Sequence, residues 1–199
     1  MPLIRKDQPV AAAAAAARLN SADPDERWVA ARELAGHAEA VDALGAALGS
    51  EPDPRVREAI FTALALTGTQ AAAAVVLPYL RLDDADQRTA ALDALRAMPE
   101  GVSSHTEALL QDDDADVRIL ACELARSLPA NEATRILSAV LERDPDPNVC
   151  GCALEVLAEV GEPDALRALA RCADRFPNET FLRFAIKVAA DRIGRPARA

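Results

Sequence analysis

The sequence is poor in aromatic residues, which make up only 3% of its 199 residues and include one tryptophan and one tyrosine. Alanine dominates the 51% of residues that are hydrophobic, so a core must form by the close approach of small side chains. Glycine (8) and proline (13) are too few for a fibrous or disordered chain. The composition therefore predicts a folded protein with a real hydrophobic core.

Long hydrophobic runs are also missing, because no run approaches the roughly 20 apolar residues of a membrane span. The first 20 residues imitate a secretory signal peptide, but alanine makes a weak apolar region and Asp7 interrupts the basic part. Four cysteines without a disulfide-framework pattern suit a reducing compartment. We expect a cytoplasmic protein that does not bind a membrane.

The body of the chain has fewer basic than acidic residues. The net charge is −10, yet residues 1–20 carry +2 and residues 181–199 carry +4, which leaves −16 for residues 21–180. A body this acidic repels phosphate backbones. Nucleic acid is therefore not expected as a partner.

The sequence does contain a repeat. Segments such as EPDPRVREAIFTALAL and DPDPNVCGCALEVLAE align so that one position, usually arginine, recurs at spacings of 30, 31, 30, 32 and 33 residues. This shared position is occupied by Arg27, Arg57, Arg88, Arg118, Cys150 and Arg183. A period of about 30 residues over most of a chain is typical of a solenoid.

An aspartate four residues before the shared position predicts the start of a helix, because its side chain can accept a hydrogen bond from a free backbone amide. The predicted caps are Asp23, Asp53, Asp84, Asp114 and Asp146, with Glu179 in a weaker sixth copy. Positions two, three and seven residues after the arginine are apolar almost throughout, which predicts one buried stripe.

A second set of amphipathic segments lies between these helices. Their expected spans are 9–19, 38–48, 70–81, 103–111, 131–143 and 163–173. Pro78 is expected to bend the last turn of its helix. The pattern predicts an all-α fold of about six helical hairpins in a single domain over residues 9–193, with tails at 1–8 and 194–199.

These segments, with their aspartate-proline turns and a valine-arginine pair, resemble HEAT repeats, and the short alanine-rich form is similar to the HEAT-like repeats named after phycobilisome lyases. The resemblance implies a right-handed α-solenoid in which the second helix of each pair lines the concave side. It also implies a ladder of aspartates and arginines between repeats, here Asp23, Asp53, Asp84, Asp114 and Asp146 with Arg27, Arg57, Arg88, Arg118 and Arg183. Cys150 departs from this pattern.

Cys150 and Cys152 raise the question of a metal or redox site. Positions i and i+2 of a helix lie about 200° apart, so the two thiols cannot bind one metal or each other without unwinding the helix. The favoured interpretation is structural, with Cys152 as a small core residue and Cys150 as a replaced arginine. No metal, cofactor or catalytic residue is expected.

The residues one and five positions after the arginine lie opposite the predicted buried stripe and form the expected concave face. The candidate partner-binding residues in these rows are Trp28, Glu58, Asp93, Glu123, Glu155 and Phe184. The carboxylates suggest a groove for a basic or amphipathic protein, although a solvated helix face is the simpler interpretation of such a charge run. Trp28 is either a binding hot spot or a cover for the open end of the stack.

Three functions follow from these features. The first is a non-catalytic scaffold or adaptor that binds a partner protein on its concave surface. The alternative is an accessory subunit in bilin-type cofactor attachment or enzyme maturation, which the resemblance alone suggests. The third, a HEAT-like DNA glycosylase, needs a basic concave surface and is disfavoured by the acidic body. The partner, the pathway and the oligomeric state are not encoded in a recognisable form.

Overall fold

The structure, a computed structural model, describes residues 8–194. These residues form helices, turns and loops, with no β-strand among them, as the sequence predicts. The chain divides into two compact units, Met1–Val102 and Ser103–Ala199. The single domain over residues 9–193 stays a prediction, and the expected tails lie outside the described residues apart from Gln8 and Gly194.

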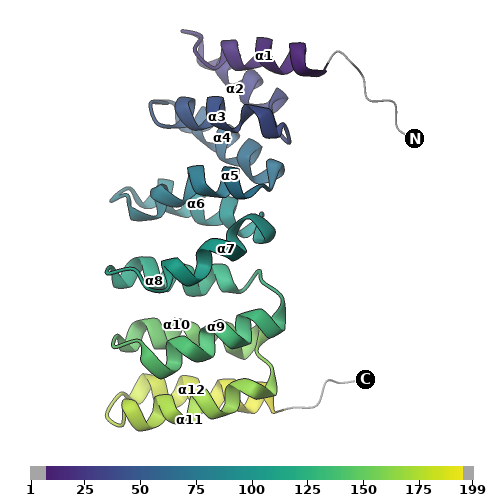
Figure 1. The fold of residues 1–199 in the computed structure, drawn as a ribbon. Coiled ribbons are helices and arrows are strands. Elements are labelled where there is room, and N and C mark those ends of the chain that lie inside the picture. The colour runs from purple at the N-terminus through teal and green to yellow at the C-terminus, as the bar shows by residue number, and fades with distance from the viewer. Residues whose placement is uncertain (1–7, 195–199) are drawn as a thin grey trace, which may run out of the picture. The chain divides into compact units, whose positions relative to one another are not determined.

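Unit 1 consists of two layers of helices, which Figure 1 shows in purple to teal. The first helices of its hairpins are α1 (Gln8–Arg18), α3 (Val41–Leu48) and α5 (Gln70–Val76), with short 3₁₀ turns at Ala38–Ala40 and Leu77–Arg81. The second helices are α2 (Pro24–Glu33), α4 (Pro54–Thr67) and α6 (Ala85–Arg96). Helix α4 contacts both α2 and α6, so the second helices form a continuous layer. Helix α7 (Pro99–Leu109) runs across the boundary between the units.

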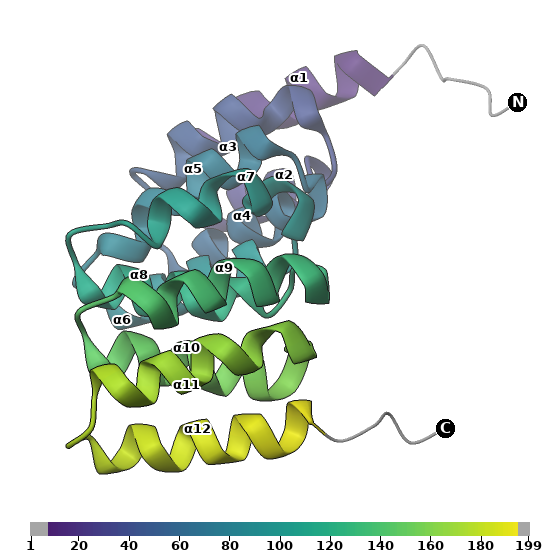
Figure 2. The ribbon, with the colours of Figure 1, turned by 60° about the horizontal axis from the view of Figure 1, so that its bottom comes forward.

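Unit 2 repeats this arrangement. Its first helices are α9 (Ala130–Arg143) and α11 (Leu166–Arg175), which follows a 3₁₀ turn at Pro163–Ala165. Its second helices are α8 (Ala115–Ala125), α10 (Pro147–Val160) and α12 (Thr180–Ile193). Helix α10 packs against α8, α9 and α12, and α12 lies at the end of the unit that Figure 2 brings forward. The predicted all-α solenoid class, made of helical hairpins, is confirmed within each unit.

The second helices begin at aspartate caps. Asp53 is the N-cap of α4, where its Oδ1 accepts a hydrogen bond of 2.8 Å from the amide of Arg55. The same bond, from the amide two residues on, is made at the starts of α2, α8 and α10 by Asp23, Asp114 and Asp146. At the start of α6, Asp84 accepts from the amide of Gln87, three residues on. Glu179 also stands at an N-cap, that of α12, but its side chain makes no capping hydrogen bond.

Proline and glycine set several helix ends. Helix α5 ends at Val76 and gives way to the 3₁₀ turn that contains Pro78, because proline lacks an amide hydrogen and clashes with the preceding turn. Gly68 ends α4 with a φ of 67°, a left-handed conformation that favours glycine. Helix α7 begins at Pro99 rather than at residue 103, because proline fits the first helical position, and the sequence prediction was wrong by a turn there.

The buried stripe is rotated from the predicted one. The positions three and seven residues after the arginine are buried in the first five repeats, for example Ile60 and Leu64. The position two residues after it is not reliably buried, since Val29 is 39% exposed. The residue before the shared position is buried instead in four repeats, at Val56, Val117, Val149 and Leu182. At about 100° per residue, this residue lies closer to the centre of the stripe than the position two residues after the arginine.

Candidate functional site

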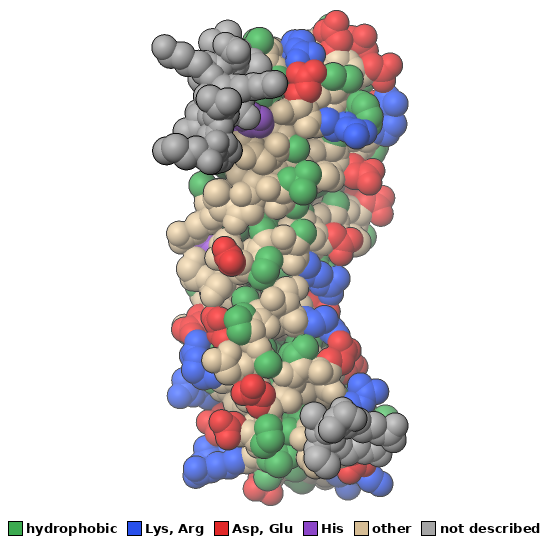
Figure 3. Space-filling view, turned by 90° about the vertical axis from the view of Figure 1, so that its right-hand side faces the viewer, with side chains coloured by type: hydrophobic (Ala, Val, Ile, Leu, Met, Phe, Trp, Pro, Cys, Tyr) green, Lys and Arg blue, Asp and Glu red, His purple; other side chains and the backbone are tan. Residues whose placement is uncertain are grey.

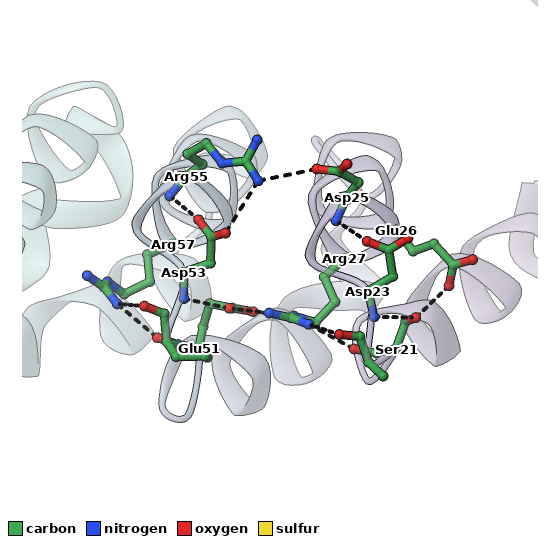
Figure 4. A network of polar contacts seen from close by, with 11 residues as sticks. Ser21, Asp23, Asp25, Glu26, Arg27, Glu51, Asp53, Arg55 and Arg57 are labelled. Atoms are coloured by element: carbon green, nitrogen blue, oxygen red, sulfur yellow. Dashed lines mark hydrogen bonds and ion pairs between the residues drawn. The ribbon is translucent and has the colours of Figure 1, made fainter.

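The arginine at the shared position joins neighbouring repeats. In unit 1, Arg27 donates from Nε and Nη2 to the two carboxylate oxygens of Glu51, at 2.7 and 2.8 Å (Figure 4). Its Nη1 donates to the carbonyl oxygens of Ser21 and Ala22. These hydrogen bonds raise the pKa of Arg27 and lower that of the Glu51 carboxyl. The network therefore holds one repeat to the loop of the next.

Unit 2 contains the same arrangement at Arg118. Its Nε and Nη2 donate to Asp144 at 2.7 and 3.1 Å, and its Nη1 donates to the carbonyl oxygens of Asp112 and Asp113. The bond to Asp144 raises the pKa of Arg118. Both partners of this ion pair are buried, with side chains 11% and 5% exposed. This ion pair therefore joins neighbouring repeats within unit 2.

The ladder differs from the expected one in its acidic partner. The carboxylates that meet Arg27 and Arg118 belong to the residue two positions before the next cap, not to the cap aspartates, because the cap oxygens are directed to backbone amides. That position holds Leu82 in the third repeat and Pro177 in the sixth. The ladder partners of Arg57 and Cys150 are therefore missing.

The remaining arginines at the shared position have other environments. Arg57 donates to the carbonyl oxygens of Glu51 and Pro52, and Arg88 to that of Leu82, so both brace their own loops. Arg183, which was expected to belong to the ladder, is exposed. The loss of arginine at position 150 thus coincides with the loss of the carboxylate that would have received it, at Pro177.

The two cysteines of α10 point to different neighbours. Cys150 is fully buried and its thiol donates to the carbonyl oxygen of Asp144 at 3.7 Å. Cys152 is only half-buried and contacts the carbonyl oxygen of Ile119 and the carboxylate of Glu123. The interpretation of Cys152 as a small core residue holds only in part, since Cys152 packs against the core but is half-buried. Cys150, interpreted as a replaced arginine, is the more deeply buried of the two, because the buried stripe is rotated toward the arginine position.

The cysteines form no disulfide, and no group of three or more potential metal ligands lies together in the part of the chain that the structure describes. A hydrogen bond to Cys172 and burial raise the pKa of the Cys150 thiol. The same hydrogen bond lowers the pKa of Cys172. Both thiols are fully buried, so their contact is part of the core of unit 2.

A groove of about 640 Å³ runs between α4 and α6 in unit 1. Two of the predicted partner-binding residues, Glu58 and Asp93, line it from opposite sides. Asp86 also lines it, at the start of α6. Both predicted carboxylates are exposed, and Asp93 makes only a long contact of 3.4 Å with Arg96. This part of unit 1 is therefore an open, acidic groove.

A second groove of about 630 Å³ lies between α2 and α4 and contains Trp28. The guanidinium of Arg32 lies 4.5 Å from the centre of the Trp28 ring, and Arg55 and Glu58 line the opposite wall. The two grooves lie on either side of α4 and share its row Glu58, Thr62 and Leu66, so they adjoin each other. Trp28 thus lies in a groove that faces the next repeat, and whether it is a binding hot spot stays open.

Unit 2 has a smaller groove of about 280 Å³ between α10 and α12. Glu155 and Phe184, both predicted as partner-binding, line it together with Glu159 and Val188. Phe184 is the most exposed large hydrophobic residue among those described, at 71%. Its exposure is costly for a folded chain unless another surface covers it.

Glu123 does not join an acidic strip with Glu155, as the sequence suggested. Its carboxylate is only 20% exposed and pairs with Arg126, which also forms an ion pair with Glu159. The arginine is supplied one turn along α8, where i,i+3 pairs meet on a helix surface. Figure 3 likewise shows acidic and basic side chains side by side within each unit rather than in separate blocks.

Sequence reasoning missed Leu66, which is 66% exposed and lines both grooves of unit 1. It lies nine residues after the arginine, one helical turn beyond the row of Thr62, so extending the concave rows by four residues would have found it. The same extension gives Ala97 in the α4–α6 groove, and Glu159 and Arg192 in the groove of unit 2.

Stacked helical hairpins, aspartate caps and inter-repeat arginines define a repeat protein built from helix pairs. The family model for HEAT repeats matches residues 9–96 and 103–190, so the chain belongs to the HEAT-repeat family. A comparison with curated proteins gives no match. The two matched segments lie in different units.

Solved structures share the fold at low sequence identity. An archaeal HEAT-like repeats protein from Thermococcus onnurineus NA1 is 16% identical, with a TM-score of 0.52 over 93% of this chain and 87% of that one. Human deoxyhypusine hydroxylase is 18% identical, with a TM-score of 0.49 over 92% and 84%. The complex of CpcE and CpcF of phycocyanin lyase from Nostoc sp. PCC7120 contains a chain that is 20% identical, with a TM-score of 0.41 over 91% and 94%.

Proposed function

We propose that this HEAT-repeat chain is a non-catalytic scaffold or adaptor that binds a partner protein through the grooves between its second helices. The observation that carries the proposal is the exposure of large apolar side chains inside those grooves, Leu66 in unit 1 and Phe184 in unit 2. Apolar side chains rimmed by charged ones are typical of protein-binding surfaces.

The charged rim suits such a role. Glu58 and Asp93 in unit 1 and Glu155 in unit 2 surround the apolar residues, and all three are exposed. Exposed charges steer association and select partners more than they add affinity. A protein with a basic or amphipathic surface therefore fits these grooves better than a uniformly acidic one.

The test is capture of a partner from the source cell with the tagged chain, followed by identification and repetition with variants. Trp28→Ala and Phe184→Ala shorten groove residues, whereas Asp42→Lys and Asp174→Lys reverse exposed charges on the first helices α3 and α11. We expect the groove variants to lose at least part of the partner and the first-helix variants to retain it. If both groove variants retained the partner and the first-helix variants lost it, the partner would bind the layer of first helices instead.

The partly buried Trp28 allows a quantitative version of this experiment. If Trp28 is a hot spot, Trp28→Ala weakens partner binding by about 2 kcal/mol or more. A melting temperature that falls while the affinity stays unchanged would instead identify Trp28 as a stabilising residue of the first hairpins.

A further inference from the structure

The two adjoining grooves of unit 1, together called the unit 1 groove, change charge from α2 to α6. At the α2 end the groove is lined by Trp28 and Arg32, with Arg55 and Glu58 on the opposite wall, on α4. At the α6 end it is lined by the carboxylates of Asp86 and Asp93. A ligand that crosses the groove from α2 to α6 therefore meets cationic groups first and anionic groups last.

The cationic end depends mainly on Arg32. Its guanidinium lies over the Trp28 ring, 4.5 Å from the ring centre, and its side chain is exposed, so its N–H groups remain accessible to a carboxylate. Arg55 is engaged by the carboxylates of Asp25 and Asp53, so part of its charge is already compensated. Arg32 is thus the better partner for an acidic side chain of a ligand.

The middle of the groove, on α4, carries the apolar Leu66 beside the polar Glu58 and Thr62. Leu66 is 66% exposed and belongs to the lining of both parts, next to Ala65 on the α6 side and Ala63 on the α2 side. Covering a leucine side chain is favourable by roughly 1.5–3 kcal/mol when it becomes fully buried. An apolar side chain of a ligand would therefore be placed between the two charged ends.

We propose that the unit 1 groove binds a linear segment of a partner protein that carries an acidic, an apolar and a basic residue in that order from α2 to α6. Packed helices lie about 8–10 Å apart, and an extended chain advances about 3.3 Å per residue. In the bound segment, the apolar residue is therefore about three positions from the acidic residue and about three positions from the basic one. The inference rests on the proposed scaffold function and adds the chemistry of the bound segment. A purely basic segment is the competing occupant, and the experiments below separate the two.

The first experiment selects nine-residue peptides from a random display library on the intact chain. We expect the enriched sequences to carry one acidic, one apolar and one basic residue at about three-residue spacing, in either direction of the peptide chain. Enrichment of uniformly basic sequences, or no enrichment over an unrelated helical protein, would overturn the proposal.

The second experiment measures the affinity of a labelled peptide from that selection for groove variants. Leu66→Asp is expected to weaken it by about tenfold or more. The matched control is Leu166→Asp, which changes an exposed leucine on α11 and should leave the affinity unchanged. Because both leucines are exposed, the melting temperature should change little in either variant. Equal binding by the wild-type chain and Leu66→Asp would contradict the proposal.

A charge exchange tests the order of the charges. Arg32→Glu should weaken the selected peptide by about two- to fivefold, the range of an exposed ion pair. A peptide in which lysine replaces the acidic residue should recover that loss on Arg32→Glu, and only there. Arg167→Glu on α11, also exposed, is the control. If the affinity of the selected peptide were the same for the wild-type chain and Arg32→Glu, the acidic residue of the peptide would not lie at the α2 end.

Failure of this inference is distinguishable from failure of the scaffold function. A captured partner that is retained by Leu66→Asp and Arg32→Glu but lost by Phe184→Ala binds in unit 2. That result would contradict the inference about the unit 1 groove and would still agree with the scaffold function. A chain from which no groove variant removes any captured protein would contradict both.

Discussion

The carboxylates of Glu51 and Asp144 each bind an arginine of the preceding repeat and also a backbone amide two residues further along their own loop. Glu51 accepts from Arg27 and from the amide of Asp53, and Asp144 accepts from Arg118 and from the amide of Asp146. At the scale of single residues, one side chain thus links the packing of two repeats to the cap of the next helix.

Removing the Asp144 carboxylate should therefore lower the free energy of unfolding. Asp144→Ala leaves the buried Arg118 without its carboxylate, and the loss of one partner of a buried pair costs about 3 kcal/mol. Chemical denaturation should show this loss as a lower midpoint. The control is Asp113→Ala, whose side chain is exposed and which should change stability by no more than about 0.5 kcal/mol. Equal effects of the two variants would show that the pair contributes nothing specific.

The cysteines should react in a fixed order with a thiol reagent. Cys152 is half-buried, whereas Cys122, Cys150 and Cys172 are 0% exposed. Burial and hydrogen bonding also raise the pKa values of Cys122 and Cys150, which lowers their thiolate fraction. Mass spectrometry of the native chain after brief alkylation should find Cys152 modified first. Earlier modification of Cys150 would contradict the packing described for α10.

At the scale of helices, the caps were predictable because they depend on residues that are close in the sequence. An aspartate before a proline or another helix-starting residue leaves few alternatives for the chain. The rotation of the buried stripe was less predictable, since alanine is tolerated both in the core and on the surface. Val29 shows a similar ambiguity, because its apolar character fitted the stripe although it is 39% exposed.

The caps provide a prediction at the same scale. Asp146→Ala removes the acceptor of the 2.7 Å bond from the Asn148 amide and should lower stability by about 1 kcal/mol. Glu179→Ala at the start of α12 is the matched comparison, because Glu179 makes no capping bond, and it should cost clearly less. Thermal unfolding of the two variants checks this difference. A larger loss for Glu179→Ala would mean that α12 is capped in another way.

At the scale of the whole chain, stability should decrease in acid. The hydrogen bonds from Arg27 lower the pKa of Glu51, so its stabilising contribution is present above the pKa of the unfolded state and is lost as the pH falls. The cap carboxylates of Asp53 and Asp84 also have lowered pKa values, chiefly through hydrogen bonds to Arg55 and Gln87.

The expected result is a falling melting temperature below about pH 5. Glu51→Gln removes one of the contributing carboxylates, so this variant should be less stable than the wild type at neutral pH and should lose less stability between neutral pH and acid. If the melting temperatures of the two proteins fell in parallel with pH, Glu51 would not contribute to the loss of stability in acid. Gln111→Glu adds an exposed carboxylate at another position and serves as the control, with a curve close to that of the wild type.

The repeat and its fold class were predictable from the sequence, whereas the candidate site was predictable only in part. Trp28, Glu58, Asp93, Glu155 and Phe184 do line grooves, because a simple helical period places them opposite the core. The ion pairs of Glu123 and the exposure of Leu66 depend on which side chains neighbouring helices bring together. A period read along one helix does not contain that information.

Among the described residues, no helix combines the length and the apolar character of a membrane span. The central claim is that the layer of second helices is the surface that binds another protein. The claim predicts that binding affects the layer of second helices and not the layer of first helices in each unit. This difference can be measured without knowledge of the partner's structure.

The most direct measurement is hydrogen exchange of the chain alone and with its captured partner. Binding in the grooves should slow exchange in α2, α4 and α6, in α10 and α12, or in both sets, while the first helices α3, α5 and α11 exchange as before. Leu66→Asp or Phe184→Ala should abolish the protection in its own unit. Protection confined to α3, α5, α9 and α11, with the second helices unchanged, would contradict the account.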